Sequence, residues 1–519
     1  MFTSFKKTAA ANPAVLLIAT LFAAGLLIVM LAWNPFGSQS ETGDASEPLV
    51  VFCAAGILPP VEEAAAQFEK EVGLKIRFMH GNSGTLQLQI ENSHKGDLYI
   101  PADVSFVQKL KDKGLADEMI PLAKFRLVLA VQPGNPKNIE TLADLYREDV
   151  KYVIGTPQAA FGKKARKIFN ASGDWAKLEK SAKVQKTTVR DAAQDIGERF
   201  VDAGFIWDAT ARQEKLDIIS IPELNTPKAL STITVGVLSM CERPTDALRF
   251  ARYLAASDRG TKAFGKHDYE LVKGDPWAKI PEVTLYAGGL NSVACKSIVD
   301  AFRKREGVQI NVDYKGCGSL VSQMKAGEKP DMYFACDISY ATKVTDLFDP
   351  FQDVSTTRVV MLVPKGSTKV RTFADVGKAG VRLGRCDPKL SALGGLTERL
   401  LKDEGVYDQV IKNSTTHVTG PTADYLVAQL TESGALDVAF VYEANCNFIG
   451  DKATIIAIEN PIALAVQPIA VSKTTLYPQL MARLVRAITN EQSKQRFEQA
   501  KFKWIWSDTE SETLENNPK

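Results

Sequence analysis

Two short loops, rich in small and hydroxyl-bearing residues, are the best candidates for ligand binding in this sequence. Ala54-Ala-Gly-Ile-Leu-Pro-Pro60 follows one strand-like run, and Gly81-Asn-Ser-Gly-Thr85 follows the next. Small residues allow backbone N–H groups to approach an anion, and the dipole of the helix that follows favours negative charge there. The side chains of Ser83 and Thr85 could donate hydrogen bonds to an anion, although capping the helix would explain them equally well.

The same two loops recur further along the chain. Ala287-Gly-Gly-Leu-Asn-Ser292 corresponds to the first loop, and Lys315-Gly-Cys-Gly-Ser319 corresponds to the second. A shift of 234 residues aligns Val51–Lys109 with Leu285–Lys343 without a gap. A period of this length is far too long for a solenoid repeat, so it indicates that a whole domain was duplicated.

The cysteines are concentrated in the second copy. Thiolates that follow predicted strand ends could hold copper, zinc or an iron–sulfur centre. The alternative is disulfides of an exported domain, such as Cys386 with Cys446, or buried free thiols. No zinc-ligand spacing occurs, so we expect no metal site and no other cofactor. Five of the seven cysteines lie in this copy: Cys295, Cys317, Cys336, Cys386 and Cys446.

The sequence contains no recognisable catalytic motif. The four histidines have no nucleophile pattern beside them, and no G-x-S-x-G motif occurs. The pairs Asp97/Asp103 and Asp331/Asp337 could suggest acid–base chemistry, but their recurrence in both copies fits hinge or helix-capping roles better. We therefore expect no enzyme and no catalytic residues. The formal net charge of +2 also argues against binding to nucleic acid.

One segment near the N-terminus is long and apolar enough to cross a membrane. Ala14–Trp33 is uncharged and apolar apart from Thr20, and its 20 residues would span a hydrocarbon core of about 30 Å. Lys6 and Lys7 precede it, so the positive-inside rule leaves the N-terminus in the cytoplasm and the rest of the chain outside. We predict an uncleaved single-pass anchor, and a cleaved signal peptide is the alternative.

Each copy alternates strand-like runs with amphipathic helices. We expect strands at 49–53, 74–78 and 98–100, and helices at 59–70 and 84–92. This alternation predicts βαβ units and a parallel sheet, with ligands bound beyond the carboxyl ends of the strands. The predicted organisation is a cytoplasmic segment 1–13, a membrane helix 14–33, a linker 34–48, a first binding domain 49–270, a linker 271–282, a second binding domain 283–506 and a disordered tail 507–519.

Five segments of the first copy occur in an order that resembles the periplasmic molybdate-binding proteins of ABC transporters, within the type II solute-binding superfamily. They are Val51–Gly56, Gly81–Leu86, Asp97–Asp103, Arg126–Pro136 and Phe205–Asp208. The resemblance covers nearly all of both copies. It implies an α/β fold, here a tandem duplication of a two-lobed venus-flytrap domain whose lobes are joined by two crossing strands. In this family, N–H and O–H donors from both lobes enclose a tetrahedral oxyanion.

The resemblance also implies which residues contact the ligand. In the first copy these are Gly56, Ser83, Ala160, Val189 and Trp207, although the family usually has serine at the position of Gly56 and tyrosine at that of Trp207. A buried carboxylate beside a dianion is repulsive unless it is protonated or offset by a cation. An aspartate in the second site therefore leaves open whether that copy changed ligand or lost binding. The positions in the second copy are Leu290, Cys317, Ala392, Asp424 and Tyr442.

The function implied is that of an extracytoplasmic solute-binding protein. It would capture a small oxyanion such as molybdate or tungstate and deliver it to an ABC permease in the bacterial inner membrane. Both binding domains would lie in the periplasm, with one helix inserted in the membrane. The alternative is a membrane-tethered sensor or scaffold of the same fold, with a second domain that binds another ligand, or a soft metal through its cysteines.

Overall fold

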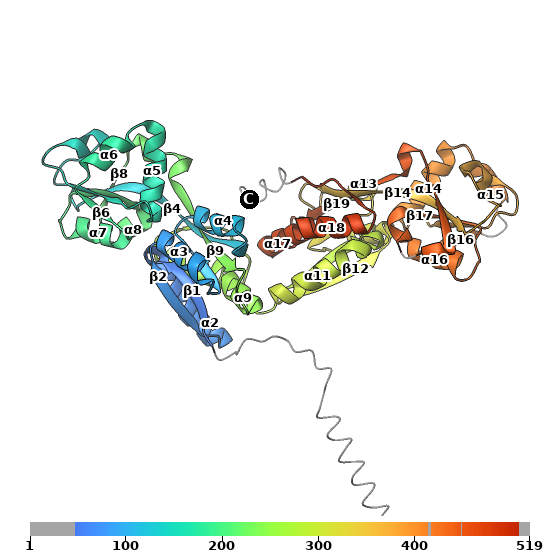
Figure 1. Cartoon of the computed structure of the whole chain (residues 1–519), viewed down its shortest axis with the longest axis horizontal. Coiled ribbons are helices and arrows are strands. Elements are labelled where there is room, and N and C mark those ends of the chain that lie inside the picture. Colours follow the sequence, from blue (N-terminus) through green and yellow to red (C-terminus); the bar gives the residue numbers. More distant parts are fainter. Residues whose placement is uncertain (1–46, 414–416, 448, 508–519) are drawn as a thin grey trace, which may run out of the picture. The chain divides into compact units, whose positions relative to one another are not determined.

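The computed structural model describes residues 47–413, 417–447 and 449–507 (Figure 1). The predicted cytoplasmic segment and membrane helix lie outside these ranges, as do residues 34–46 of the predicted linker and 508–519 of the predicted tail. Within the described ranges, no helix combines the length and the apolar character needed to cross a membrane.

The first repeat is built on one ten-stranded sheet. Two of its strands, β8 (Asp217–Ile219) and β10 (Glu270–Leu271), pair with β4 outside the main order. The main order is β2 (Ile76–Gly81), β1 (Leu49–Ala54), β3 (Leu98–Ile100), β9 (Leu230–Leu238), β4 (Ala116–Val131), β7 (Ala203–Trp207), β5 (Tyr152–Gly155) and β6 (Val184–Lys186).

Helices cover this sheet and fill the connections between its strands. The α-helices are α2 (Leu58–Val72), α3 (Ser83–Ser93), α4 (Val104–Asp112), α5 (Ala160–Ser172), α6 (Trp175–Ser181), α7 (Val189–Gly197), α8 (Asp208–Gln213), α9 (Pro244–Ala255) and α10 (Gly260–Lys266). Short 3-10 helices are η1 (Ala55–Ile57), η2 (Leu142–Tyr146), η3 (Pro222–Leu224) and η4 (Pro227–Ala229).

The second repeat has the same strand order, which confirms the predicted tandem duplication. Its additional strands β18 (Ala453–Ile456) and β20 (Lys503–Trp504) pair with β14. The main order is β12 (Gln309–Lys315), β11 (Glu282–Gly288), β13 (Met332–Phe334), β19 (Leu464–Val471), β14 (Gln352–Pro364), β17 (Val438–Tyr442), β15 (Leu383–Cys386) and β16 (His417–Gly420).

The helices of the second repeat follow the same pattern. They are α11 (Ser292–Glu306), α12 (Cys317–Lys325), α13 (Ile338–Ala341), α14 (Ala392–Asp403), α15 (Tyr407–Asn413), α16 (Ala423–Thr431), α17 (Pro478–Thr489) and α18 (Glu491–Gln499). The 3-10 helices are η5 (Gly289–Asn291), η6 (Phe373–Gly377), η7 (Glu443–Cys446), η8 (Gly450–Lys452) and η9 (Pro461–Ala463).

The elements expected at the start of the first repeat are present. The strand at 98–100 has the predicted bounds, and α2 and α3 extend the predicted helices at both ends. The strand β2 begins at Ile76, two residues later than predicted. The expected parallel pairing holds for β1 with β2 and β3 and for β5 with β6 and β7, whereas β4 and β9 pair antiparallel.

The long strand β4 divides the first repeat into two lobes. Its residues Ala116–Arg126 pair with β9, and Leu127–Val131 pair with β7. The chain therefore enters the second lobe along β4 and returns to the first lobe along β9. In the second repeat β14 and β19 make the same two crossings. These are the crossing strands that the family resemblance implied.

An arginine marks the crossing point in both repeats. Arg126 donates through its guanidinium to the carbonyl oxygens of Leu224 and Thr226, at 3.0 and 2.8 Å. Arg358 donates in the same way to the carbonyls of Ile458 and Asn460, at 2.8 and 3.2 Å. Each arginine thus ties the crossing strand to the segment that leads into the returning strand.

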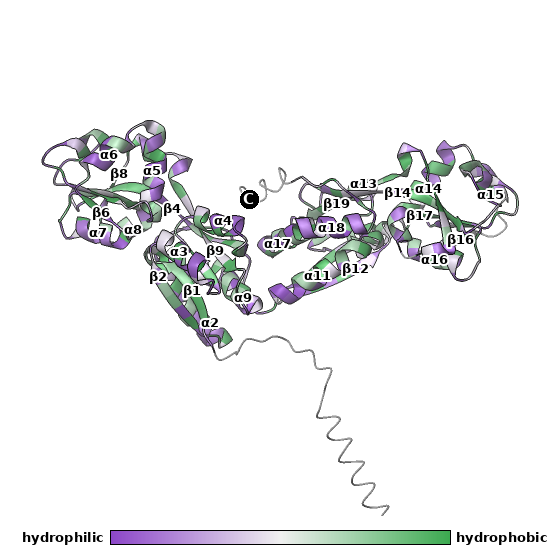
Figure 2. Cartoon of the chain, in the orientation of Figure 1, coloured by the Kyte–Doolittle hydropathy of each residue, from purple (hydrophilic) through white to green (hydrophobic). Residues whose placement is uncertain are grey.

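The core follows the hydrophobic pattern of the sequence. Figure 2 shows hydrophobic residues concentrated along the strands, with hydrophilic residues on the helices and loops that cover them. Each repeat has its own cluster of buried apolar residues, the first including Phe68, Phe125 and Phe205 and the second including Phe334 and Phe440. Burial of this apolar surface drives the strands together and positions the loops at their ends.

One buried ionic group links the two repeats. Glu306, at the end of α11, is 1% exposed and pairs with Arg252 of α9 at 2.9 Å and with Arg483 of α17 at 2.5 Å. Burial by itself would raise the pKa of Glu306, but the two guanidinium groups outweigh it and lower the pKa. The carboxylate is therefore kept ionised, because each charge has a partner.

Candidate functional site

Residues from both lobes of the first repeat line one cleft, which has about 280 Å³ of space including its opening to solvent. All five positions predicted for this repeat lie in its wall, namely Gly56, Ser83, Ala160, Val189 and Trp207. The other lining residues are Ala54, Ala55, Gly81, Asn82, Ala102, Ala159, Phe161, Thr187 and Thr188. Every lining residue is uncharged.

Ser83 presents its hydroxyl from the first lobe. The hydroxyl oxygen accepts a hydrogen bond from the N–H of Ala102 at 3.1 Å, and the Ser83 carbonyl accepts one from the Tyr99 hydroxyl at 2.6 Å. The side chain that caps α3 is that of Asn82, which accepts from the N–H of Thr85 at 2.8 Å. The capping role considered for Ser83 and Thr85 is therefore wrong. The Ser83 oxygen acts as acceptor, which leaves its hydrogen available for a second partner.

Ala160 and Val189 are the first residues of α5 and α7 in the second lobe. N–H groups in the first turn of a helix have no carbonyl partner within that helix. The side chain of Thr188 caps α7, whereas Ala159, at the N-cap of α5, has no side chain that could do so. The N-terminus of α5 therefore presents uncapped N–H groups and its positive dipole end where Ala159 and Ala160 line the cleft.

The two lobes of the first repeat touch directly beside the cleft. The N–H of Gly84 donates to the carbonyl of Gln158 across the lobe boundary at 3.0 Å. A Cβ atom on Gly84 would lie 2.6 Å from that oxygen, so glycine alone permits this approach. Lys164 of the second lobe also pairs with Asp103 of the first at 3.0 Å. These contacts hold the lobes in a closed arrangement.

The second repeat closes in the same way. The N–H of Gly318 donates to the carbonyl of Leu390 at 3.0 Å. A Cβ on Gly318 would lie 2.1 Å from the carbonyl oxygen of Lys389. The sequence alignment paired Gly84 with Gly318 but assigned no role to either. Their recurrence in both copies was the available signal.

Cys317 of the second repeat occupies the position of Ser83. Its sulfur accepts a hydrogen bond from the N–H of Cys336 at 3.1 Å, as the Ser83 hydroxyl does from Ala102. Burial would raise the pKa of the Cys317 thiol, but hydrogen bonds from Cys336 outweigh it and lower the pKa. The hydrogen bond to Cys317, together with burial, raises the pKa of Cys336 instead.

The other predicted residues of the second repeat fall at the expected elements. Leu290 is buried in η5, and Ala392 is the first residue of α14. Tyr442 ends β17, as Trp207 ends β7. Burial raises the pKa of Tyr442 well above its usual value, and the nearby Cys336 adds to this shift, so the hydroxyl remains a donor.

The prediction of a buried Asp424 in the second site is wrong. Asp424 is exposed, and its carboxylate accepts a hydrogen bond from Asn445 at 2.7 Å. The helix α16 begins one residue earlier, at Ala423, and Thr422 caps it as Thr188 caps α7. Ala423 is therefore the structural counterpart of Val189, and the repulsion expected from a buried carboxylate does not arise.

The predicted structural role of the recurring aspartates is confirmed. Asp103 and Asp337 cap α4 and α13 by accepting from the N–H of the serine two residues later. Asp97 and Asp331 accept from the N–H of Val50 and Thr284, which fixes the start of β3 and β13 against the neighbouring strand. These carboxylates accept hydrogen bonds from backbone N–H groups, which is the structural role expected for them.

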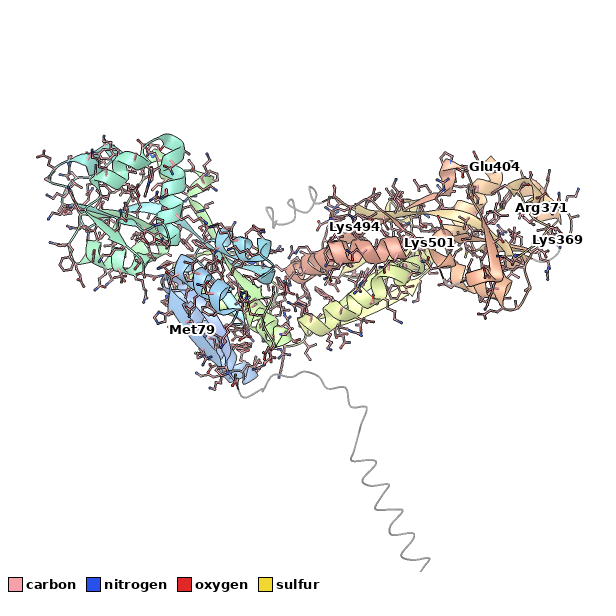
Figure 3. All side chains as sticks on the ribbon, in the orientation of Figure 1. Met79, Lys369, Arg371, Glu404, Lys494 and Lys501 are labelled. Carbon is pink, nitrogen blue, oxygen red and sulfur yellow. The ribbon has the colours of Figure 1, made fainter. Side chains whose placement is uncertain are left out.

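His80, next to the Gly81–Thr85 loop, is not among the residues that line the first cleft. His80 is exposed near the end of β2, directly after Met79, whose exposed side chain is labelled in Figure 3. Neither residue belongs to the lining of the first cleft. The exposure of His80 indicates a solvated residue.

All seven cysteines are free thiols, so the disulfide suggested between Cys386 and Cys446 is not formed. Six are buried, and Cys241 is half-buried. Across the described ranges, no group of three or more histidine, cysteine, aspartate or glutamate side chains could hold a metal ion. Buried free thiols were the other outcome that the sequence left open.

Comparison with known families agrees with this architecture. The family model of the bacterial extracellular solute-binding proteins matches residues 49–270 and again residues 283–503. The chain belongs to this family. Its members bind solutes, and the family model matches each of the two repeats of this solute-binding protein separately.

Several individual relatives of this solute-binding protein are named for molybdate binding. The molybdate-binding protein ModA of Mycobacterium bovis is 24% identical over 245 residues, which are 46% of this chain and 91% of the relative. The molybdate/tungstate-binding protein WtpA of Pyrococcus abyssi is 24% identical, covering 39% of this chain and 72% of the relative. Among solved structures, the periplasmic molybdate-binding protein of Azotobacter vinelandii matches at 19% identity and a TM-score of 0.37, covering 43% of this chain and 100% of that one.

Proposed function

We propose that the first repeat binds a small tetrahedral oxyanion of the molybdate or tungstate type. The observation that carries this proposal is the first cleft, where both lobes contribute and every lining residue is uncharged. Its donors are the Ser83 hydroxyl and backbone N–H groups at the starts of α5 and α7. A desolvated oxyanion accepts hydrogen bonds from such neutral donors, and hydrogen bonds to charged groups are stronger than neutral ones.

Closure couples binding to a change of shape. Only the closed arrangement brings Ser83 of the first lobe and Ala160 of the second to one ligand, so the ligand has a higher affinity for the closed state. That difference in affinity is what drives closure. The Gly84–Gln158 contact then completes the closed form without adding a side chain to the cleft.

The same proposal extends to transport. The names of the relatives, together with the family, support capture of the anion outside the cytoplasm and delivery to an ABC permease in the bacterial inner membrane. The apolar segment Ala14–Trp33 would serve as an uncleaved single-pass anchor, with 49–270 and 283–506 as periplasmic binding domains. Mass spectrometry of the protein purified from membranes tests this anchor, because a cleaved chain would lack residues 14–33.

Calorimetry of the full chain with molybdate, tungstate, sulfate and phosphate tests the ligand class. Ser83→Ala should weaken molybdate binding by about 1–3 kcal/mol, because a hydrogen bond to a charged group is lost. Ser93→Ala provides a matched control, since this exposed serine ends the same helix. Equal affinities for wild type and Ser83→Ala would contradict the proposed site.

A further inference from the structure

The second repeat holds two thiols at the positions where a hydroxyl and a methyl group line the first cleft. Cys317 and Cys336 are 0% and 5% exposed. The point that a Cβ on Gly288 would occupy lies 2.9 Å from the first sulfur and 2.1 Å from the second. Two sulfurs this close to a single point are within reach of one bound atom.

Two residue differences between the repeats compensate each other. Gly288 stands at the position of Ala54, and Cys336 stands at the position of Ala102. A methyl group on Gly288 would collide with the Cys336 sulfur. Because protein interiors are close-packed, the lost methyl makes room for the added sulfur, and the two differences depend on each other. The local packing of the second repeat is therefore adapted to the thiol pair.

The Cys317 sulfur takes the place of the Ser83 hydroxyl oxygen in the local hydrogen bonding. The N–H of Cys336 donates to Cys317 at 3.1 Å, and the N–H of Ala102 donates to Ser83 at 3.1 Å. A thiol is a weaker hydrogen-bond donor than a hydroxyl, so an oxyanion would lose a good donor at this position. The second repeat therefore favours a ligand that bonds to sulfur.

One buried hydroxyl of the second repeat, that of Tyr442, has no hydrogen-bond partner within the described residues. Tyr442 is 3% exposed and ends β17, as Trp207, which lines the first cleft, ends β7. The buried Tyr333 differs, because its hydroxyl interacts with the Cys317 sulfur. Tyr442 also interacts electrostatically with Cys336 and Cys317. A buried hydroxyl without a partner is unfavourable, and a bound oxygen atom would satisfy it.

We propose that Cys317 and Cys336 bind a trivalent thiophilic oxyacid of the arsenous-acid type. Each thiol replaces one hydroxyl on the arsenic centre. Two As–O bonds break, two As–S bonds form, and the two thiol protons leave with the two hydroxyl groups as water. No electrons are transferred. The remaining As–OH oxygen accepts a hydrogen bond from Tyr442.

Charge favours this ligand class over a soft metal cation. A monovalent cation bound by two thiolates leaves a net negative charge, and Asp337 already lies beside the pair. The arsenous adduct is neutral, so it avoids burying a further charge. Access requires the lobes to part, because Gly318, next to Cys317, contacts Leu390 of the other lobe.

The test is native mass spectrometry of the reduced full chain with arsenite, with arsenate, molybdate, copper(I) and zinc in parallel. We expect one arsenite adduct that has lost two waters, together with protection of Cys317 and Cys336 from alkylation by N-ethylmaleimide, mapped on peptides. Cys317→Ser should abolish the adduct. Tyr442→Phe should weaken binding by roughly 5- to 10-fold, because one hydrogen bond is lost.

Cys295→Ala is the matched control, because this buried thiol of α11 has only burial acting on its pKa and should leave the adduct unchanged. If Cys317→Ser does not fold, the alkylation map of the wild type decides the question. An adduct that survives Cys317→Ser, binding of copper(I) or zinc without arsenite, or a Cys317–Cys336 disulfide that resists reduction would each overturn the proposal. None of these outcomes depends on whether the first repeat binds molybdate.

Discussion

The two repeats share one fold but carry different functional groups at corresponding positions, hydroxyl and N–H donors in the first and thiols in the second. In the first, the Ser83 hydroxyl and open backbone N–H groups face a space lined by uncharged residues. In the second, Cys317 and Cys336 place sulfur where the first repeat has the hydroxyl of Ser83 and the methyl group of Ala102. The backbone framework is the same, so a handful of side chains at the strand ends decides which ligand each cleft prefers.

The repeats also differ in how they are joined. The end of α11 carries Glu306, whereas the corresponding position of α2 is Val72. Only the second repeat therefore supplies the buried carboxylate that pairs with Arg252 and Arg483. Glu306 adds a buried ionic contact to the other contacts that α11 makes with the first repeat, such as Arg305 with Glu118.

The largest effect is expected from breaking this buried group. Glu306→Gln leaves Arg252 and Arg483 buried without a carboxylate, which should cost about 3–5 kcal/mol of stability. Urea denaturation followed by circular dichroism measures the change. Asp300→Asn, which removes an exposed ion pair with Arg303 on the same helix, is the control and should cost little. A similar loss in both variants would show that Glu306 has no special role.

The next largest effect tests whether both repeats close through a glycine. Gly84→Ala places a methyl group 2.6 Å from the Gln158 carbonyl oxygen, which should destabilise the closed form by about 1–3 kcal/mol. Oxyanion binding by the first repeat should weaken accordingly in calorimetry. Gly197→Ala in α7, whose Cβ would meet Leu216 at an ordinary 3.8 Å, serves as control. Unchanged affinity in Gly84→Ala would mean that ligand binding does not require this contact.

The smallest effect concerns the ion pair that spans the lobes of the first repeat. Burial would raise the pKa of Asp103, but Lys164 and hydrogen bonds from Ser105 and Ser231 outweigh it and lower the pKa. The stabilisation is therefore present above the unfolded pKa of about 3.9 and is lost as the pH falls through the lower folded value. Asp103→Asn should remove this dependence and cost about 1 kcal/mol.

Thermal melts of the first repeat's ligand-bound form between about pH 6 and pH 3 would measure this loss. The corresponding Asp337 lies 3.9 Å from Arg399, a longer separation than the 3.0 Å between Asp103 and Lys164. Asp337→Asn should therefore have the smaller effect. Equal effects in the two repeats would mean that the shorter ion pair adds nothing to closure.

Much of the fold could be predicted because it follows from local patterns. The alternation of strands and helices indicated an α/β domain. A shift of 234 residues aligned about sixty positions without a gap, which indicated two copies of that domain. The family's segment order then placed five residues that the structure brings into a single cleft. Those positions follow strand ends and open helices, which are the most regular points of such a fold.

The parts that could not be predicted depend on contacts across lobes or strands. The sequence analysis aligned Asp424 with Val189, whereas the cap at Thr422 shows that Ala423 is the counterpart. Gly84 has no unusual φ angle, so its need for a small residue appears only when Gln158 lies opposite. A carbonyl 74 residues away leaves no local pattern in the sequence.

Sequence alone determined that this chain is two copies of one α/β domain, because hydrophobic periodicity and repeated motifs depend on neighbouring residues. The order of its motifs added the resemblance to solute-binding proteins. Only the tertiary structure decided that Cys317 and Cys336 form a pair, since parallel strands bring together two loops that are 19 residues apart. It also decided that Gly288 must lack a side chain, because the space it leaves is filled by a sulfur from another strand. Close packing, which depends on three-dimensional neighbours, is the physical reason for both.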